Sequence, residues 1–127
     1  MVRLLLDSHV VLWWLMDDHR LGARARAAIS DANEVAISVA TPWELGIKQR
    51  LGKLELPDDF VAAIAGDDFR LLPIELEHVV AAAALPLHHR DPFDRVLVAQ
   101  ARSDALTLVS ADRSFRAYDA ELLDAAA

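Results

Sequence analysis

The stretch LLLDSH, residues 4–9, determines how the rest of this chain is expected to be arranged. Three consecutive leucines without polar alternation are typical of a strand that is covered on both faces, as in the middle of a parallel sheet. The run ends at Asp7, Ser8 is a good helix N-cap, and the apolar segment 10–16 predicts a helix directly after it. A carboxylate is therefore expected at the carboxyl end of a buried strand, where open α/β sheets bind their ligands.

The composition predicts one domain, residues 1–127, with a full hydrophobic core, because 54% of its residues are hydrophobic and no linker or repeat interrupts it. The absence of cysteine excludes disulfides, thiolate metal sites and cysteine nucleophiles. No apolar run reaches the ~18 residues of a membrane span. The N-terminus also lacks the apolar core of a signal peptide. We therefore expect a soluble, cytoplasmic protein with no membrane contact.

The net charge of −7 comes from 20 acidic and 13 basic residues. By itself it argues against nucleic-acid binding, because phosphate contacts are normally made by a basic surface. Carboxylates that hold divalent cations reduce this conflict, since a bound metal inverts the local charge.

Strand and helix patterns alternate along the chain. Strands are expected at 35–39, 70–72 and 106–109, with a last edge strand at 121–123. Helices are expected at 21–29, 41–51, 58–65, 76–83 and 91–101, and Gly52 ends the second of these. This alternation predicts a mainly parallel sheet with helices on both faces.

Apolar stripes predict which helix faces point inward. Phe60, Val61 and Ile64 form one such stripe, and 76–83 carries another at Leu76, Val79, Val80 and Ala83. The first helix, 10–16, has no polar face at all. Either its own domain covers it completely or, as we favour, another chain covers its outer side.

Four acidic residues occupy comparable places. Asp7 and Asp112 follow strands, whereas Glu44 and Asp94 are expected at position N3 of helices that begin with a cap and a proline. With parallel strands, all four can converge at one edge of the sheet. Carboxylates gathered without cysteine or a His-x-x-x-His pair favour Mg²⁺ or Mn²⁺. Such a metal binds a phosphodiester oxygen, activates a water and stabilises the leaving oxygen.

Each acid also has an ordinary structural explanation. Glu44 and Asp94 can serve as capping-box residues, and Asp112 can cap the short helix after it. Asp7 is harder to explain in this way, because an acid directly after three buried leucines risks a costly desolvation. The joint pattern favours a shared metal site over four separate caps.

Serine hydroxyls and one further acid accompany these residues. Ser8 and Ser110 could orient the neighbouring carboxylates by hydrogen bonds, although Ser8 fits equally well as a plain N-cap. Asp91 is interpreted as the cap of its helix, outside the metal's ligands.

Two basic residues are candidates for contact with substrate. Lys48 lies four residues after Glu44, so it can reach a phosphate or form a helical ion pair with Glu44. Arg95, next to Asp94, could likewise make either a phosphate contact or a surface salt bridge.

Four segments together resemble one known family. They are LLLDSHVVLW at 4–13, WELGIKQRLGKL at 43–54, HRDPFDRVLVAQA at 89–101 and LVSAD at 108–112. With these residues the chain resembles a PIN domain and, within that family, the VapC toxins of bacterial toxin–antitoxin pairs. Ser8 stands where threonine is more frequent, which keeps the hydroxyl.

The resemblance implies a three-layer α/β/α sandwich around a mainly parallel sheet of about five strands. It implies an Mg²⁺- or Mn²⁺-dependent endoribonuclease that stops translation by cutting RNA. Asp7, Glu44 and Asp94 would form the principal acidic cluster, and Asp112 would be its fourth member, more often reached through water.

The resemblance also implies partners: a second copy in a homodimer and a VapB-type antitoxin. The C-terminal segment of such an antitoxin wraps the toxin and can present a basic residue to the acidic pocket. Trp13 or Trp14 on the first helix, which has no polar face, is then expected to cover a groove for either partner.

We therefore expect RNA hydrolysis by a metal-activated water, which leaves a 5′-phosphate and a 3′-hydroxyl without a side-chain nucleophile. Three alternatives stay open. A receiver-like domain would accept phosphate on an aspartate, but it needs a lysine after its last main strand, and this chain has none beyond Lys53. A non-catalytic module would use the acidic pocket to bind a basic peptide. A related nuclease would cut DNA or structured flaps.

Overall fold

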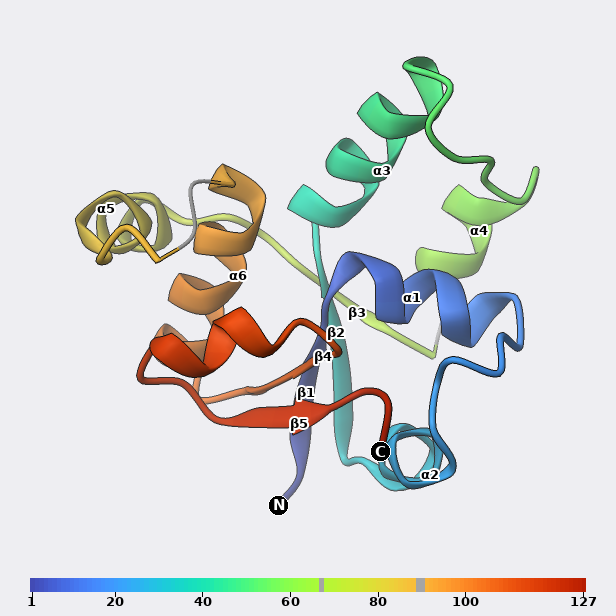
Figure 1. The fold of residues 1–127 in the computed structure, drawn as a ribbon, viewed down its shortest axis with the longest axis horizontal. Helices are drawn as coiled ribbons and strands as arrows, with labels where there is room; N and C mark the ends of the chain where they lie inside the picture. Colours follow the sequence, from blue (N-terminus) through green and yellow to red (C-terminus); the bar gives the residue numbers. More distant parts are fainter. Residues whose placement is uncertain (67, 89–90) are drawn as a thin grey trace.

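A computed structural model describes residues 1–66, 68–88 and 91–127 of the chain (Figure 1). His89 and Arg90, the first two residues of the third family-like segment, lie outside these ranges. The strands are β1 Arg3–Leu6, β2 Glu34–Ser38, β3 Arg70–Leu72, β4 Thr107–Ser110 and β5 Leu122–Asp124. The helices are α1 Ser8–Leu15, α2 Ala23–Asp31, α3 Ala40–Arg50, α4 Phe60–Ile64, α5 Leu76–Ala84, α6 Pro92–Ser103 and the 3₁₀ turn η1 Arg113–Ala117. No helix in the described ranges is long and apolar enough to cross a membrane.

The five strands form one parallel sheet in the order β3-β2-β1-β4-β5. β1 is central, with Leu6 opposite Ile37 of β2 and Val109 of β4. The predicted parallel α/β sheet is confirmed, and the three leucines that predicted a doubly covered strand are all almost fully buried.

Helices cover both faces of the sheet, which gives three layers (Figure 1). Leu4 and Leu6 point to a core formed with α1, α2, α4 and Leu45 of α3. Leu5 points to the opposite core, formed with α6 and η1. This alternation follows from the two-residue period of a strand.

The order of the strands reverses between β1 and β4, since β2 and β3 lie on one side of β1 and β4 and β5 on the other. Ligands of open α/β sheets bind at such a reversal, outside the carboxyl ends of the strands. Asp7 follows β1 there, and Ser110 ends β4 beside it. The topology therefore places both residues at the edge that the sequence indicated.

Two helices begin differently from the expectation. Asp7, rather than Ser8, is the N-cap of α1, and its carboxylate accepts the His9 N–H at 2.7 Å. α3 begins at Ala40, where Ser38 Oγ accepts the N–H, so Glu44 lies beyond the first turn and is not an N3 capping residue. The capping explanation therefore fails for Glu44 and holds for Asp7.

Two of the predicted inward faces are wrong. In α5 the stripe of Leu76, Val79 and Val80 faces outward, and His78 and Ala82 are the buried residues. In α4 Phe60 and Ile64 are buried, whereas Val61 is exposed. Both helices are short and apolar around most of their circumference, so the stripe could not identify the side that meets the core.

The first helix is covered mainly by its own chain. Trp13 and Trp14 are half-buried and pack against the core that contains Leu4 and Leu6 of β1. The Arg20 guanidinium lies over the Trp13 ring, 5.3 Å from its centroid. Its own chain therefore covers α1 in large part, and the interpretation that another chain covers the remaining outer side stays a prediction.

Candidate metal centre

A small cavity of about 170 Å³ opens at the carboxyl edge of the sheet. It brings together the four acidic residues singled out from the sequence with four neighbours, and its lining is Asp7, Ser8, His9, Glu44, Lys48, Asp91, Asp94 and Asp112. These residues come from the start of α1, from α3, from the start of α6 and from the segment after β4. Residues separated by up to 105 positions in sequence thus share one pocket.

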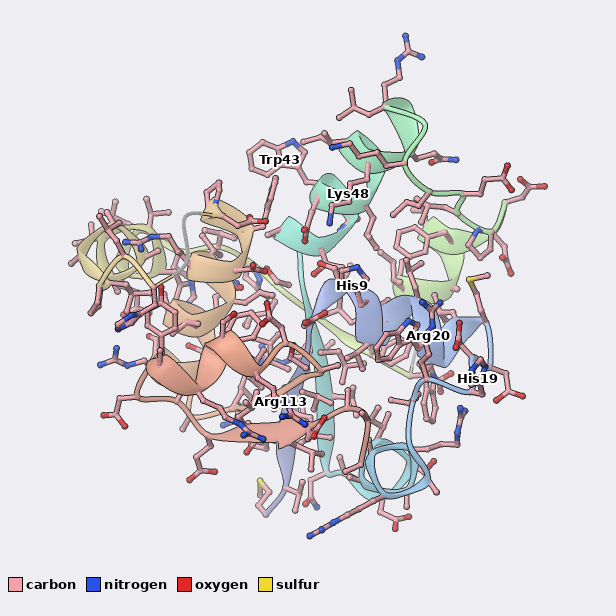
Figure 2. The ribbon with its side chains drawn as sticks, in the orientation of Figure 1. His9, His19, Arg20, Trp43, Lys48 and Arg113 are labelled. Atoms are coloured by element: carbon pink, nitrogen blue, oxygen red, sulfur yellow. The ribbon has the colours of Figure 1, made fainter. Side chains whose placement is uncertain are left out.

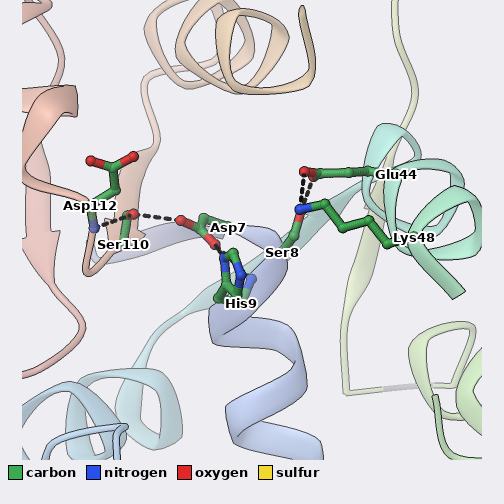
Figure 3. Close-up of polar contacts among 7 residues, drawn as sticks. All are labelled: Asp7, Ser8, His9, Glu44, Lys48, Ser110 and Asp112. Carbon is green, nitrogen blue, oxygen red and sulfur yellow. Dashed lines mark hydrogen bonds and ion pairs between the residues drawn. The ribbon is translucent and has the colours of Figure 1, made fainter. Parts of the chain in front are cut away.

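Asp7 is held from two sides in this cavity (Figure 3). One carboxylate oxygen accepts the His9 N–H, and the other accepts the Ser110 hydroxyl at 2.5 Å. Ser110 Oγ in turn accepts the Asp112 N–H at 3.0 Å. Burial raises the pKa of Asp7, and the hydrogen bonds from Ser110 and His9 oppose this shift. Ser110 therefore links the two acids that follow the central strands.

Glu44 is held in a similar way by a hydroxyl and an ammonium group (Figure 3). The Ser8 hydroxyl donates to Glu44 Oε1, and Lys48 Nζ lies 3.1 Å from Oε2. The ion pair expected between Glu44 and Lys48 is therefore present. Because Lys48 also lines the cavity, the pair leaves its ammonium group at the acidic pocket rather than on the outer surface.

The pKa of Asp94 is also raised in this cavity. Desolvation, followed by repulsion from Asp91, Glu44, Asp7 and Asp112, raises its pKa to about 7. Carboxylate repulsion of this kind is a mark of a shared anionic site. Asp112 also caps η1, where it accepts the Ser114 N–H at 2.9 Å, so capping and membership of the cavity coexist in one residue.

Asp91 belongs to the cavity, contrary to the sequence interpretation. It does cap α6, since its Oδ1 accepts the Phe93 N–H at 2.8 Å. Asp91, Asp94 and Glu44 nevertheless each offer a carboxylate oxygen within 4.8 Å of the other two. The sequence signal was available, because Asp91 lies three residues before Asp94 and therefore on the same side of the helix start.

The donor set suits a hard divalent cation. Mg²⁺ and Mn²⁺ bind carboxylate oxygens, and three such oxygens within 4.8 Å of one another can share one ion. A cation would also relieve the repulsion that raises the pKa of Asp94. The chemistry of the residues present therefore fits a metal.

Comparison with known families agrees with this geometry. The model of the PIN domain family matches residues 4–121, which is nearly the whole chain. The chain belongs to the PIN domain family. Ribonuclease VapC22 of Mycobacterium tuberculosis is 31% identical to it over 121 residues, which are 93% of each protein.

Solved structures share the fold at lower sequence identity. VapBC2 from Rickettsia felis, solved bound to a DNA fragment from its promoter, has a TM-score of 0.71 at 14% identity and covers 97% of this PIN domain and 98% of its own chain. FitAcB from Neisseria gonorrhoeae has a TM-score of 0.68 at 23% identity, with 95% and 96% covered. These likenesses support the α/β/α architecture.

Arg95 of this PIN domain is a structural residue, so both interpretations made from the sequence are wrong. Its side chain is buried, and it donates to the carbonyl oxygens of Ala82, Leu85 and Pro86 at 2.7–3.0 Å. These carbonyls end α5 and begin the following turn, where helices leave acceptors unsatisfied. Arg95 therefore ties α5 to α6 and does not face the cavity.

A neighbour that the sequence did not assign is His9 of the same PIN domain. Its imidazole is largely exposed, lines the cavity and places Nδ1 4.0 Å from Asp7 Oδ1. Its position two residues after an acid that ends a buried strand is the signal that could have identified it.

The pKa of Asp94 predicts how pH affects the metal-free protein. Between about pH 4 and about pH 7 the folded state keeps a proton that the unfolded state releases, so this group lowers stability as pH rises. Asp94→Asn avoids the penalty. Its unfolding temperature in EDTA should exceed that of the wild type near about pH 8, and the difference should close near about pH 4. Circular dichroism melts test this, and a pH-independent difference would contradict it.

Proposed function

We propose that this PIN domain is a metal-dependent endoribonuclease of the VapC type. The observation that supports this most directly is the convergence of Asp7, Glu44, Asp94 and Asp112 on one cavity. The 31% identity to a protein named Ribonuclease VapC22 supports RNA as the substrate.

Asp7, Glu44 and Asp94 are the proposed metal ligands, with Asp91 close enough to Glu44 and Asp94 to take part and Asp112 in the same cavity. Mg²⁺ or Mn²⁺ bound there supplies Lewis-acid activation of a water and of the scissile phosphodiester. In this proposal water, rather than a side chain or the RNA 2′-hydroxyl, attacks the phosphorus and the 3′ oxygen leaves, so hydrolysis would give a 5′-phosphate and a 3′-hydroxyl.

The polar residues around the carboxylates have positioning roles in this proposal. Ser110 and Ser8 each donate a hydroxyl to one acid, which fixes the direction of its free lone pairs. Lys48 lowers the charge of the pocket beside Glu44, so an anionic phosphate can approach it. Lys48 is therefore the better candidate than Arg95 for contact with substrate.

A VapB-type antitoxin is the proposed protein partner, and inhibition of translation through RNA cleavage is the proposed effect in the cytoplasm. Proteins of similar structure include a toxin–antitoxin complex from Klebsiella pneumoniae and VapBC-5 of Mycobacterium tuberculosis, a member of the VapBC family of toxin–antitoxin systems. An acidic cavity is also the surface to which a basic antitoxin residue can bind.

The receiver-like alternative has less support. Both oxygens of Asp7 accept hydrogen bonds within the chain, and the sequence has no lysine after β4. No observation favours the non-catalytic module or a DNA substrate over RNA, so both enter the test below.

Chelation tests the proposed function. Purified protein should cleave single-stranded RNA in Mg²⁺ or Mn²⁺, lose cleavage in EDTA and regain it when the metal is restored, since in this proposal the bound metal lowers the pKa of the attacking water. The products are resolved on gels and their ends identified by 5′-phosphate-dependent exonuclease digestion. Full-rate cleavage in EDTA would contradict the proposal, as would metal binding by calorimetry without turnover. Cleavage of DNA alone would reassign the substrate.

A further inference from the structure

A pair of aromatic rings lies on α1 directly beside the acidic cavity. His9 lines the cavity, and its side chain is 60% exposed. Trp13 follows four residues later, on the same face of the helix. The two ring centroids are 6.4 Å apart, and the ring planes make an angle of 47°. The rings of His9 and Trp13 therefore form a continuous surface, the α1 platform, which extends from the cavity along the helix.

The turn that follows α1 holds the Trp13 ring in place. The Arg20 guanidinium lies over the ring in a cation–π contact, 5.3 Å from its centroid. Asp18 accepts two hydrogen bonds from the same guanidinium, at 2.7 and 3.1 Å, and its N–H donates to the Trp13 carbonyl oxygen at 2.9 Å. Because these contacts fix Trp13 in the free protein, a ligand that binds to its ring does not have to order it first.

The other two tryptophans lie elsewhere. Trp14 lines a separate cavity with Glu34 and Arg70, at the amino ends of β2 and β3. Trp43 is 63% exposed, but Figure 2 shows that it leaves α3 on a different side from Lys48, which extends toward His9. Trp13 is therefore the tryptophan that continues the lining of the acidic cavity through His9.

We propose that the α1 platform binds an unpaired nucleobase of the RNA substrate, next to the phosphodiester that enters the cavity. This inference rests on the proposed function, since a nuclease site implies a nucleic-acid strand beside it. His9 and Trp13 position the strand in this proposal, and neither takes part in proton transfer.

The charge of the chain favours a contact with bases over a contact with the RNA backbone. Phosphate contacts from a basic surface normally supply much of the affinity for nucleic acid, but this chain carries −7. Two cations near this surface already pair with acids, Lys48 with Glu44 and Arg20 with Asp18. Stacking on an aromatic ring needs no positive surface, because every base has a π-face. An acidic protein can therefore hold RNA by its bases.

The geometry of the two rings suits a flat ligand. A centroid separation of 6.4 Å lies within the usual range for interacting rings. Because the planes are tilted by 47°, a base that stacks on the exposed His9 ring has its edge directed at Trp13, which is a favourable edge-to-face contact. His9 also lines the cavity, so the phosphate next to this base lies at the carboxylates.

The α1 platform also defines the substrate class. A base that stacks on protein has left the stack of its own strand, and the bases of an RNA duplex are not available for such a contact. Stacking discriminates weakly between bases. The platform therefore selects unpaired segments, such as loops and single strands, over duplexes, and it does not require one particular sequence.

Cleavage kinetics on an unstructured RNA of about ten nucleotides test the proposal. His9→Ala and Trp13→Ala should each raise KM roughly tenfold and leave kcat within about threefold of wild type, because they remove binding contacts and keep the metal ligands. His9→Phe and Trp13→Phe should keep KM within about threefold of wild type, since each retains a ring. If His9 instead transferred a proton, His9→Phe would lower kcat.

An abasic nucleotide provides the matched test on the RNA side. At one position beside the cut it should raise the wild-type KM roughly tenfold, and it should add little to the effect of Trp13→Ala, because the same contact is already lost. Trp14→Ala is the protein control, since Trp14 is also half-buried against the same core but faces the other cavity, and its KM should equal that of the wild type. Circular dichroism monitors the fold, and if Trp13→Ala does not fold, the exposed His9 still provides the test.

Binding without turnover separates this proposal from the ribonuclease activity. Fluorescence anisotropy of the same end-labelled RNA in EDTA measures binding under conditions in which cleavage is not expected. Weaker binding by both alanine variants, restored by phenylalanine, would support the α1 platform even if the wild type never cleaves RNA, and that outcome would contradict the proposed function alone.

Unchanged KM and unchanged binding in both alanine variants would overturn the α1 platform and leave the ribonuclease proposal in place. Alanine variants that handle RNA as the wild type does but lose a protein partner would also overturn it, and would assign this face of α1 to that partner. A wild type that binds no RNA, with or without Mg²⁺, would overturn both proposals.

Discussion

Asp94→Asn is expected to reduce RNA cleavage by ~10³-fold or more while the protein stays folded, a loss of about 4 kcal/mol of transition-state stabilisation. Asparagine keeps the size of the side chain but removes the charge that a cation requires. The fold tolerates the change, because repulsion from neighbouring carboxylates already opposes ionisation of Asp94. Initial rates on single-stranded RNA in saturating Mg²⁺, together with thermal melts, provide the measurement.

Asp7→Asn should have a comparable effect on cleavage, since its remaining carbonyl oxygen can still accept the His9 N–H and cap α1. Asp31→Asn is the control, because Asp31 is an exposed acid at the end of α2 and removes the same charge away from the cavity. Its rate should equal that of the wild type. A cleavage rate within about threefold of wild type for Asp94→Asn would remove Asp94 from the proposed ligands.

Arg95→Ala is expected to lower the free energy of unfolding by about 3 kcal/mol or more. The substitution removes the guanidinium from the carbonyl oxygens of Ala82, Leu85 and Pro86 and opens a cavity between α5 and α6. The Ala82 oxygen keeps the Leu85 N–H and the Pro86 oxygen keeps the Tyr118 hydroxyl, so the Leu85 oxygen is the acceptor most affected. Urea unfolding followed by circular dichroism measures the change.

Arg95→Lys should recover only part of this stability, because an ammonium group lacks the planar fork that reaches several carbonyls at once. Arg102→Ala is the matched control on the same helix, since Arg102 is exposed, and its effect should stay within about 0.5 kcal/mol. If Arg95→Ala instead left stability unchanged and weakened RNA binding, the structural role would be wrong and a substrate contact would replace it.

The sheet was predictable because its signals are local. Residues 4–6 are apolar without alternation, and such a strand has few places other than the centre of a parallel sheet. The helix faces were less predictable. In α5, Leu76, Val79 and Val80 form a good amphipathic stripe, yet His78 and Ala82 meet the core. The apolar stripe indicates that one face of the helix is apolar. It does not indicate whether that face packs against the core.

The candidate site was predictable where an acid follows a strand and less so where an acid begins a helix. Asp7 and Asp112 were placed by strand ends, and both also serve as helix caps in the structure. Asp91 was set aside because it caps α6, although one oxygen of a carboxylate can cap while the other faces a cavity. One aspartate can therefore cap a helix and belong to the site at the same time.

By itself the sequence determined the parallel α/β architecture, the family and the residues at the sheet edge. Strand burial, turn chemistry and short motifs all depend on residues that are adjacent in sequence. Only the tertiary structure decided that Asp91 joins Asp94 and Glu44, that Arg95 ties α5 to α6, and that Trp43 rather than Trp13 or Trp14 is exposed. These outcomes depend on how helices distant in sequence pack on the sheet. The periodicity of a single helix contains no information about that packing.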